Sequence, residues 1–129
     1  MQGSRKFSTP CCLAALLLAI IPIACGGPKE ADPDLARKAL VTVLDAWHDG
    51  RSVDEASNIS PSTTVADPDW QAGYKLAKYE VAGTTSSAGF DLMIPVELWL
   101  RDPKGKDVRH KVRYTVSLTP ARTVLRAPL

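Results

Sequence analysis

The chain has 129 residues, of which 45% are apolar and 23% are charged, a balance typical of a folded globular protein. Its length favours a single domain. The formal net charge is +2, with 16 Lys and Arg against 14 Asp and Glu, which is too close to neutral for binding nucleic acid through bulk charge. We therefore expect no nucleic-acid partner.

The first 24 residues have the layout of a targeting segment. Arg5 and Lys6 make the N-terminal region basic, and an apolar stretch follows at 11–24. This stretch contains Pro22 and is shorter than the roughly 20 apolar residues that a bilayer-spanning helix needs. Its length instead fits the hydrophobic region of a signal peptide.

The end of this segment, Ile23-Ala24-Cys25-Gly26, resembles the lipobox of bacterial lipoproteins. The resemblance implies that a peptidase cuts before Cys25 and that its thiol is diacylated, so that the protein is anchored to a membrane outside the cytoplasm. Two or three acyl chains hold a protein durably, whereas one binds reversibly. Pro22 departs from the family pattern, which usually has an aliphatic residue there. The alternatives are an ordinary secretory signal cut near Ala24 and an uncleaved anchor.

The lipoprotein interpretation divides the chain into three parts. Residues 1–24 are the signal peptide, residues 25–31 a polar tether rich in Gly and Pro, and residues 32–129 one domain. Charge is unevenly spread over the mature chain: residues 25–69 hold nine acids and four bases, whereas residues 70–129 hold five acids and ten bases. We expect the two halves to attract each other, or the basic half to present a charged surface.

Cysteines and histidines limit the metal and redox chemistry of the mature chain. Cys11 and Cys12 leave with the signal peptide, so Cys25 remains as the one cysteine, without a partner for a disulfide. His48 and His110 are the two histidines, and they show no metal-ligand spacing. We expect no cofactor and no metal site.

The domain begins with a capped amphipathic helix. Asp32 is a suitable N-cap, Pro33 suits the first helical position, and Gly50 is a natural stop. This pattern predicts a helix over about Pro33–Asp49. Its apolar face comprises Ala36, Leu40, Val43, Leu44 and Trp47.

Three shorter signals follow the helix. The capping-box spacing of Ser52–Glu55 predicts one further helical turn. The Ser- and Thr-rich stretch at Asn58–Thr64 indicates a loop. Asp67–Trp70 indicates a capped turn, with Trp70 folded back on the core.

From Gly73 onward the apolar pattern changes to the period of two that is typical of strands. Phe90–Leu100 and Asp107–Leu118 alternate and flank a hairpin turn at 102–105. Since Pro95 cannot donate to a ladder, we expect its strand to be an edge strand or to be bulged near its middle. Tyr74–Val81 predicts another strand, with a bulge where its alternation slips between Leu76 and Tyr79, and Thr123–Arg126 predicts a last short one.

These elements predict an α+β domain in which one long N-terminal helix packs on a three- to four-stranded antiparallel sheet. Leu40, Leu44 and Trp47 are expected to face the apolar side of the sheet. The order of elements resembles the cystatin-like and NTF2-like folds.

The predicted sheet has a basic surface on its polar side. Arg109, Lys111 and Arg113 alternate on one face of their strand, and Trp99 falls on the polar face of the strand before it. These four residues are the candidate interaction surface. The alternative is a solvated face in which the cations pair with Asp91 and Glu97 across the strands.

Two functional hypotheses remain open. The first is a small lipoprotein of the cell envelope, anchored through Cys25, whose domain binds or scaffolds an envelope protein or an anionic polymer without catalysis. The second is a cystatin-like or NTF2-like small-molecule or enzymatic pocket between helix and sheet, with His48 or a carboxylate as acid or base. Asp67 and Asp69 could serve as paired carboxylates, but a turn is the simpler explanation. Because no catalytic motif is present, we expect no enzymatic activity.

Overall fold

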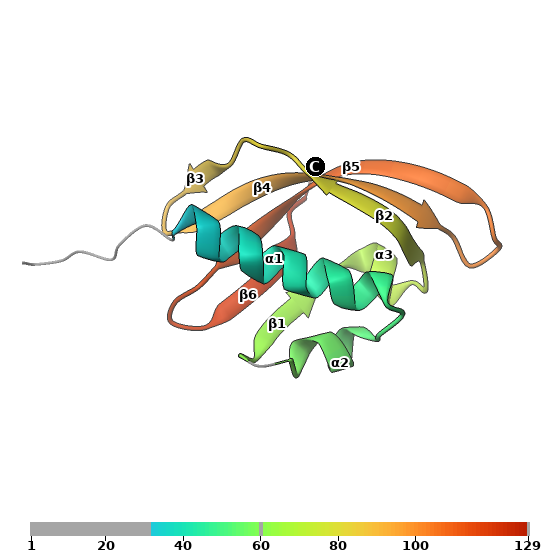
Figure 1. The fold of residues 1–129 in the computed structure, drawn as a ribbon, viewed down its shortest axis with the longest axis horizontal. Helices are drawn as coiled ribbons and strands as arrows, with labels where there is room; N and C mark the ends of the chain where they lie inside the picture. The colour runs from blue at the N-terminus through green and yellow to red at the C-terminus, as the bar shows by residue number, and fades with distance from the viewer. Residues whose placement is uncertain (1–31, 60, 129) are drawn as a thin grey trace, which may run out of the picture.

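The computed structural model describes residues 32–59 and 61–128 (Figure 1). Cys25, the predicted signal peptide and the predicted tether lie outside the described residues. The helices and strands follow in the order α1 (Pro33–His48), α2 (Val53–Ser57), β1 (Thr63–Ala66), α3 (Pro68–Gln71), β2 (Lys75–Val81), β3 (Ser86–Ala88), β4 (Asp91–Arg101), β5 (Asp107–Ser117) and β6 (Arg122–Arg126).

The predicted fold class, one long helix on a three- to four-stranded antiparallel sheet, is wrong. The described residues form three short helices and a curled, mixed sheet of six strands. The strand order is β1-β6-β5-β4-β2, with β3 beside β4, and β1 pairs with β6 in parallel. With four and three residues, β1 and β3 are too short to show a clear alternation, so the sequence pattern did not reveal them.

Helix α1 begins where the capping signal places it. The Asp32 side chain accepts hydrogen bonds from the backbone N–H groups of Asp34 (2.9 Å) and Leu35 (3.5 Å). The helix has 16 residues and is followed by Gly50 at a φ of 85°, a conformation that glycine adopts without strain. Its buried residues lie on one face: Ala36, Ala39, Leu40, Val43, Leu44, Ala46 and Trp47.

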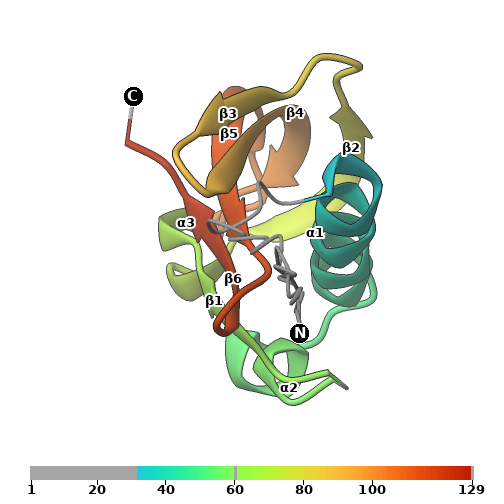
Figure 2. The same ribbon diagram turned by 90° about the vertical axis from the view of Figure 1, so that its left-hand side faces the viewer.

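The β4–β5 hairpin is the centre of the sheet. Ten successive residue pairs join the two strands without a register shift, from Leu92↔Val116 to Arg101↔Asp107. Alternate residues of both strands therefore point into the core, where α1 packs against them. Figure 2 shows α1 lying to one side of this sheet. The core residues of the hairpin are Leu92, Ile94, Val96, Leu98, Leu100, Val112, Tyr114 and Val116.

The expectation of an edge strand, or a bulge, at Pro95 is wrong. Strand β4 has partners on both sides, and its register with β5 is regular through Pro95. On its other side, β2 ends at Val81 and β3 begins at Ser86, so Pro95 lies opposite the break between them. The Pro95 carbonyl accepts a hydrogen bond from Ala82 N–H at 2.9 Å, so the backbone of Pro95 faces this break and not β5. The missing N–H of proline therefore costs the β4–β5 ladder nothing.

Of the predictions for shorter segments, two are confirmed and one is partly wrong. The bulge expected in the Tyr74–Val81 strand is confirmed, because the β2–β4 register shifts between Leu76 and Lys78. The helical turn predicted from the Ser52–Glu55 spacing is confirmed as α2, where the Ser52 side chain caps the helix by accepting from Glu55 N–H at 3.1 Å. The predicted loop is too long at its end, since β1 starts at Thr63.

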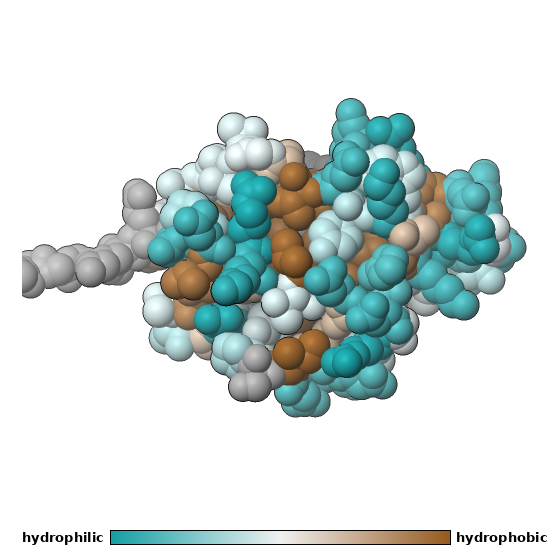
Figure 3. All heavy atoms as spheres, viewed as in Figure 1, coloured by the Kyte–Doolittle hydropathy of each residue, from teal (hydrophilic) through white to brown (hydrophobic). Residues whose placement is uncertain are grey.

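The α1 side of the molecule carries hydrophilic side chains interspersed with small apolar areas (Figure 3). Among the described residues, the large apolar side chains that are most exposed are Leu35, at 48%, and Phe90, at 57%. Single exposed apolar side chains are normal on a protein surface. The candidate site is therefore sought among the polar groups of the sheet.

Candidate functional site

The face of the sheet that points away from the core carries a surplus of cations. Cross-strand register places eleven charged or aromatic residues of β2, β4 and β5 on this open face. Six are cations and four are acids, a difference of two positive charges. They are Lys75, Lys78 and Glu80 on β2, Asp91, Glu97, Trp99 and Arg101 on β4, and Asp107, Arg109, Lys111 and Arg113 on β5.

Trp99 lies between two cations in the middle of the open face. Lys78 on β2 and Arg109 on β5 are the residues directly opposite it. Lys78 Nζ lies 4.7 Å, and Arg109 Cζ 4.9 Å, from the centroid of the Trp99 ring. Both distances allow cation–π attraction. Beside the ring is a groove of about 420 Å³, so the half-buried indole is accessible from solvent.

Only part of the predicted basic stripe is neutralised. Arg109 forms an ion pair with Glu97. The hydrogen bond between them lowers the pKa of the Glu97 carboxyl and raises the pKa of the Arg109 guanidinium. Among the described residues, Lys111 and Arg113 have no carboxylate within ion-pair distance. Asp91, the other expected partner, instead accepts a hydrogen bond from the Ser117 hydroxyl.

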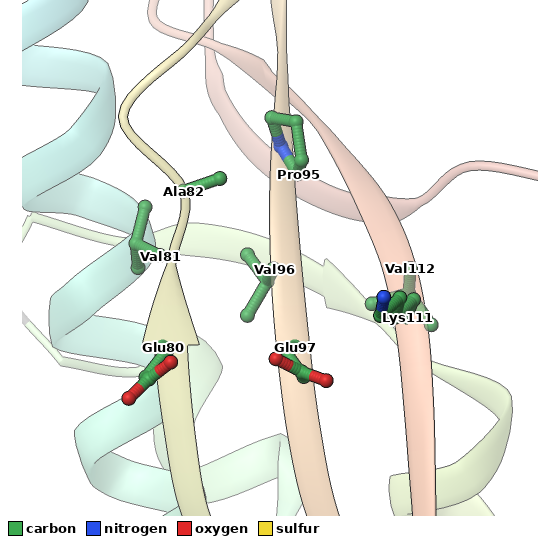
Figure 4. Close-up of a pocket in the computed structure, with 8 residues that line it drawn as sticks. All are labelled: Glu80, Val81, Ala82, Pro95, Val96, Glu97, Lys111 and Val112. Carbon is green, nitrogen blue, oxygen red and sulfur yellow. The ribbon is translucent and has the colours of Figure 1, made fainter.

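Next to Trp99 the open face has a second groove, of about 320 Å³ (Figure 4). The carboxylates of Glu80 and Glu97 lie abreast on β2 and β4, and Lys111 projects from β5 beside Glu97. The hydrogen bond and charge of Arg109, and the nearby charge of Lys111, lower the pKa of Glu97, so its carboxylate stays ionised. The groove is therefore a charged surface rather than a dry cavity suited to acid–base catalysis.

A second cluster of charged groups, which sequence reasoning did not find, lies on the core side of the sheet. Asp67 is 1% exposed, and its two carboxylate oxygens accept bonds from Arg126 Nη2 at 2.8 and 2.9 Å. The Tyr114 hydroxyl also donates to Asp67. Asp69 accepts from the same Arg126 nitrogen at 2.9 Å and lies 3.0 Å from His110 Nδ1.

This cluster binds its own members rather than a ligand. Burial would raise the pKa of the Asp69 carboxyl, but the hydrogen bonds and charges of Arg126 and His110 lower it overall. Burial, together with the charge of Asp67, raises the pKa of Tyr114. Asp67 also caps α3 by accepting from Asp69 N–H (2.9 Å) and Trp70 N–H (3.2 Å), so its lone pairs are occupied. The carboxylates thus join α3 to β5 and β6, and the predicted capped turn is one part of this junction.

The space between α1 and the sheet, where the second hypothesis places its pocket, is filled with side chains. Leu40, Leu44 and Trp47 are at most 3% exposed and belong to the same core cluster as the strand residues. His48 is exposed at the end of α1, and its Nδ1 lies 3.7 Å from Asp49. This position fits a solvated imidazole at the negative end of a helix.

The described residues hold no group of three or more His, Cys, Asp or Glu side chains arranged to bind a metal ion. No helix within 32–59 or 61–128 is long and apolar enough to cross a membrane. Comparison with known proteins finds no matching family model, curated protein or solved structure.

Proposed function

We propose that this protein is a lipid-anchored, non-catalytic binding protein of the bacterial cell envelope, which holds an anionic partner against the open face of its sheet. The observation that carries the binding part is Trp99 between Lys78 and Arg109. Lys111 and Arg113 lie beside them and have no carboxylate within ion-pair distance in the part of the chain that the structure describes. A half-buried aromatic ring that solvent reaches, set among cations, offers both apolar contact and charge to a partner. The anchoring part rests on the likeness of Ile23-Ala24-Cys25-Gly26 to a lipobox.

The anchor is tested by mass spectrometry of the full-length protein made in a bacterial host. Cleavage before Cys25, with the mass of two or three acyl chains added, is the expected result. The Cys25→Ala variant should leave the membrane fraction. An unmodified mature chain, or retention of residues 1–24, would overturn the anchoring part.

The binding surface is tested by retention of the full-length protein on immobilised polygalacturonate and poly-L-glutamate at low salt. The double variant Lys111→Gln, Arg113→Gln should lose most of the retention, because it removes the two cations of β5 that have no carboxylate within ion-pair distance among the described residues. The control, Lys38→Gln with Lys104→Gln, removes the same charge from α1 and the hairpin turn. Equal retention of both variants would show that net charge, and not this face, is responsible.

A further inference from the structure

Strand β5 is longer than β6, its neighbour on one side. Strand β6 pairs only with Tyr114–Ser117, and the last contact along this edge is the bond from Ala127 N–H to Arg113 C=O, at 2.9 Å. No strand of the described chain pairs with residues 107–112 on that side, whereas β4 covers their other side completely. Figure 1 shows the β4–β5 hairpin continuing past the end of β6.

The backbone groups of this free half point outward. In an antiparallel ladder each residue directs its N–H and C=O to the same side, and successive residues alternate. Arg113 directs its carbonyl towards β6, so Lys111 and Arg109 direct theirs to the free side. A notch of about 350 Å³ adjoins this edge. It is lined by Asp69, Arg109, His110, Lys111, Val112 and Arg126.

The free half of β5 has charged side chains but no bulge. Proteins commonly protect a strand edge with Lys and other charged residues, with a bulge or with a covering segment. Strand β2, at the opposite side of the sheet, has such a bulge between Leu76 and Lys78. Strand β5 keeps a regular register with β4 over its whole free half, so its outward backbone groups are evenly presented.

We propose that the free half of β5 binds an extended acidic segment of a partner protein, which joins the sheet as an additional antiparallel strand. Main-chain hydrogen bonds from Arg109 and Lys111 supply the pairing. The side chains of Arg109, Lys111 and Arg113 lie on the open face at every second position, so acidic side chains at every second position of the new strand lie opposite cations. The inference rests on the proposed function and names the class of its partner.

The same charges disfavour a second copy of this chain as the occupant. Pairing two β5 edges would set the row Arg109, Lys111 and Arg113 against an identical row on one sheet face. Like charges directly opposite each other destabilise a pair of strands. An acidic strand is attracted by this row of cations, whereas the β5 edge of a second copy is repelled by it.

The test uses the full-length protein and a labelled hexapeptide in which Glu and Val alternate, with binding followed by fluorescence anisotropy. Lys111→Pro removes the outward N–H and leaves the β4 ladder intact, whereas Lys111→Ala removes the same charge and keeps the N–H. We expect the proline variant to bind about tenfold more weakly than the alanine variant, the effect of about one lost hydrogen bond. Equal affinities would overturn the proposal.

A second measurement leaves the protein unchanged. In the expected antiparallel pairing, the Glu residues of the peptide direct their N–H groups to β5 and the Val residues direct theirs away. N-methylation of the Glu residues should abolish binding, and N-methylation of the Val residues should not. Binding that survives both modifications would overturn strand addition. Retention on polygalacturonate without any peptide binding would also overturn it, while leaving the proposed function intact.

Discussion

Asp67 joins three elements through one carboxylate. It caps α3, accepts the guanidinium of Arg126 from β6 and accepts the hydroxyl of Tyr114 from β5. A carboxylate that is 1% exposed is tolerated only when its charge is paired and its lone pairs are filled, as they are here. Removal of its charge would leave Arg126, whose side chain is 13% exposed, without its closest partner.

Replacing Asp67 with Asn should therefore lower the free energy of unfolding by about 3 kcal/mol. Asparagine is as good an N-cap as aspartate, so the loss reports the ion pair rather than the cap of α3. Urea unfolding of the variant and the wild type gives the difference. Asp69→Asn is the control and should lose less, because Asp67 still holds Arg126. A larger loss of unfolding free energy in Asp69→Asn than in Asp67→Asn would show that Asp69, and not Asp67, is the main partner of Arg126.

The Asp69 carboxyl makes the free energy of unfolding depend on pH in the acidic range. The pKa of its carboxyl is lowered in the folded state from the ordinary 3.8, so its contribution is present above pH 3.8 and is lost as pH falls through the lower folded value. The difference in free energy of unfolding between wild type and Asp69→Asn should shrink as pH falls below about 4. Urea titrations at several pH values measure it. A difference independent of pH would mean that the ionised carboxylate contributes nothing.

At the scale of elements, α3 shows how a helix of four residues persists. Its Trp70 stacks on Trp47 of α1, with centroids 5.1 Å apart and planes at 5°, and donates Nε1–H to the Arg51 carbonyl at 3.0 Å. So short a helix is not stable by itself. Tertiary contacts of Trp70 and Asp67 hold it in place.

Trp70→Ala should therefore cost about 3–5 kcal/mol of unfolding free energy, the range for truncating a buried aromatic side chain. Trp70→Phe keeps a ring against Trp47 but loses the indole N–H, so its loss should be clearly smaller. Both values come from urea unfolding. Equal losses would assign the effect to the Arg51 hydrogen bond instead of the aromatic packing.

Elements with a long local pattern were predictable, and those formed by distant segments were not. The cap at Asp32 and the alternation of β4 and β5 are local signals, which the structure repeats. The parallel pairing of β1 with β6 joins residues about sixty positions apart, and no local pattern encodes it. The same holds for the candidate sites: the basic stripe of β5 was visible as an alternation, whereas the cluster of Asp67 and Arg126 spans 59 positions.

At the scale of the whole molecule, the uneven charge of the chain is divided between two uses. Part of the acidic half meets the basic half inside the fold, where Asp67 and Asp69 hold Arg126. Most of the remaining bases lie on β2 and β5, and the open face of the sheet has six cations and four acids. Internal pairs thus stabilise the fold, and the surplus is left for the surface that we propose binds a partner.

These two uses should respond differently to salt. Raising NaCl from about 0.05 M to about 1 M shortens the Debye length to roughly 3 Å, which screens exposed charges and affects buried pairs much less. Retention of the full-length protein on polygalacturonate should disappear, while the urea midpoint changes little, because the Asp67–Arg126 pair lies in the interior. If the urea midpoint falls over the same salt range as the retention, the exposed cations of the open face stabilise the fold. Their charge would then have a structural role, which would contradict a role limited to binding a partner.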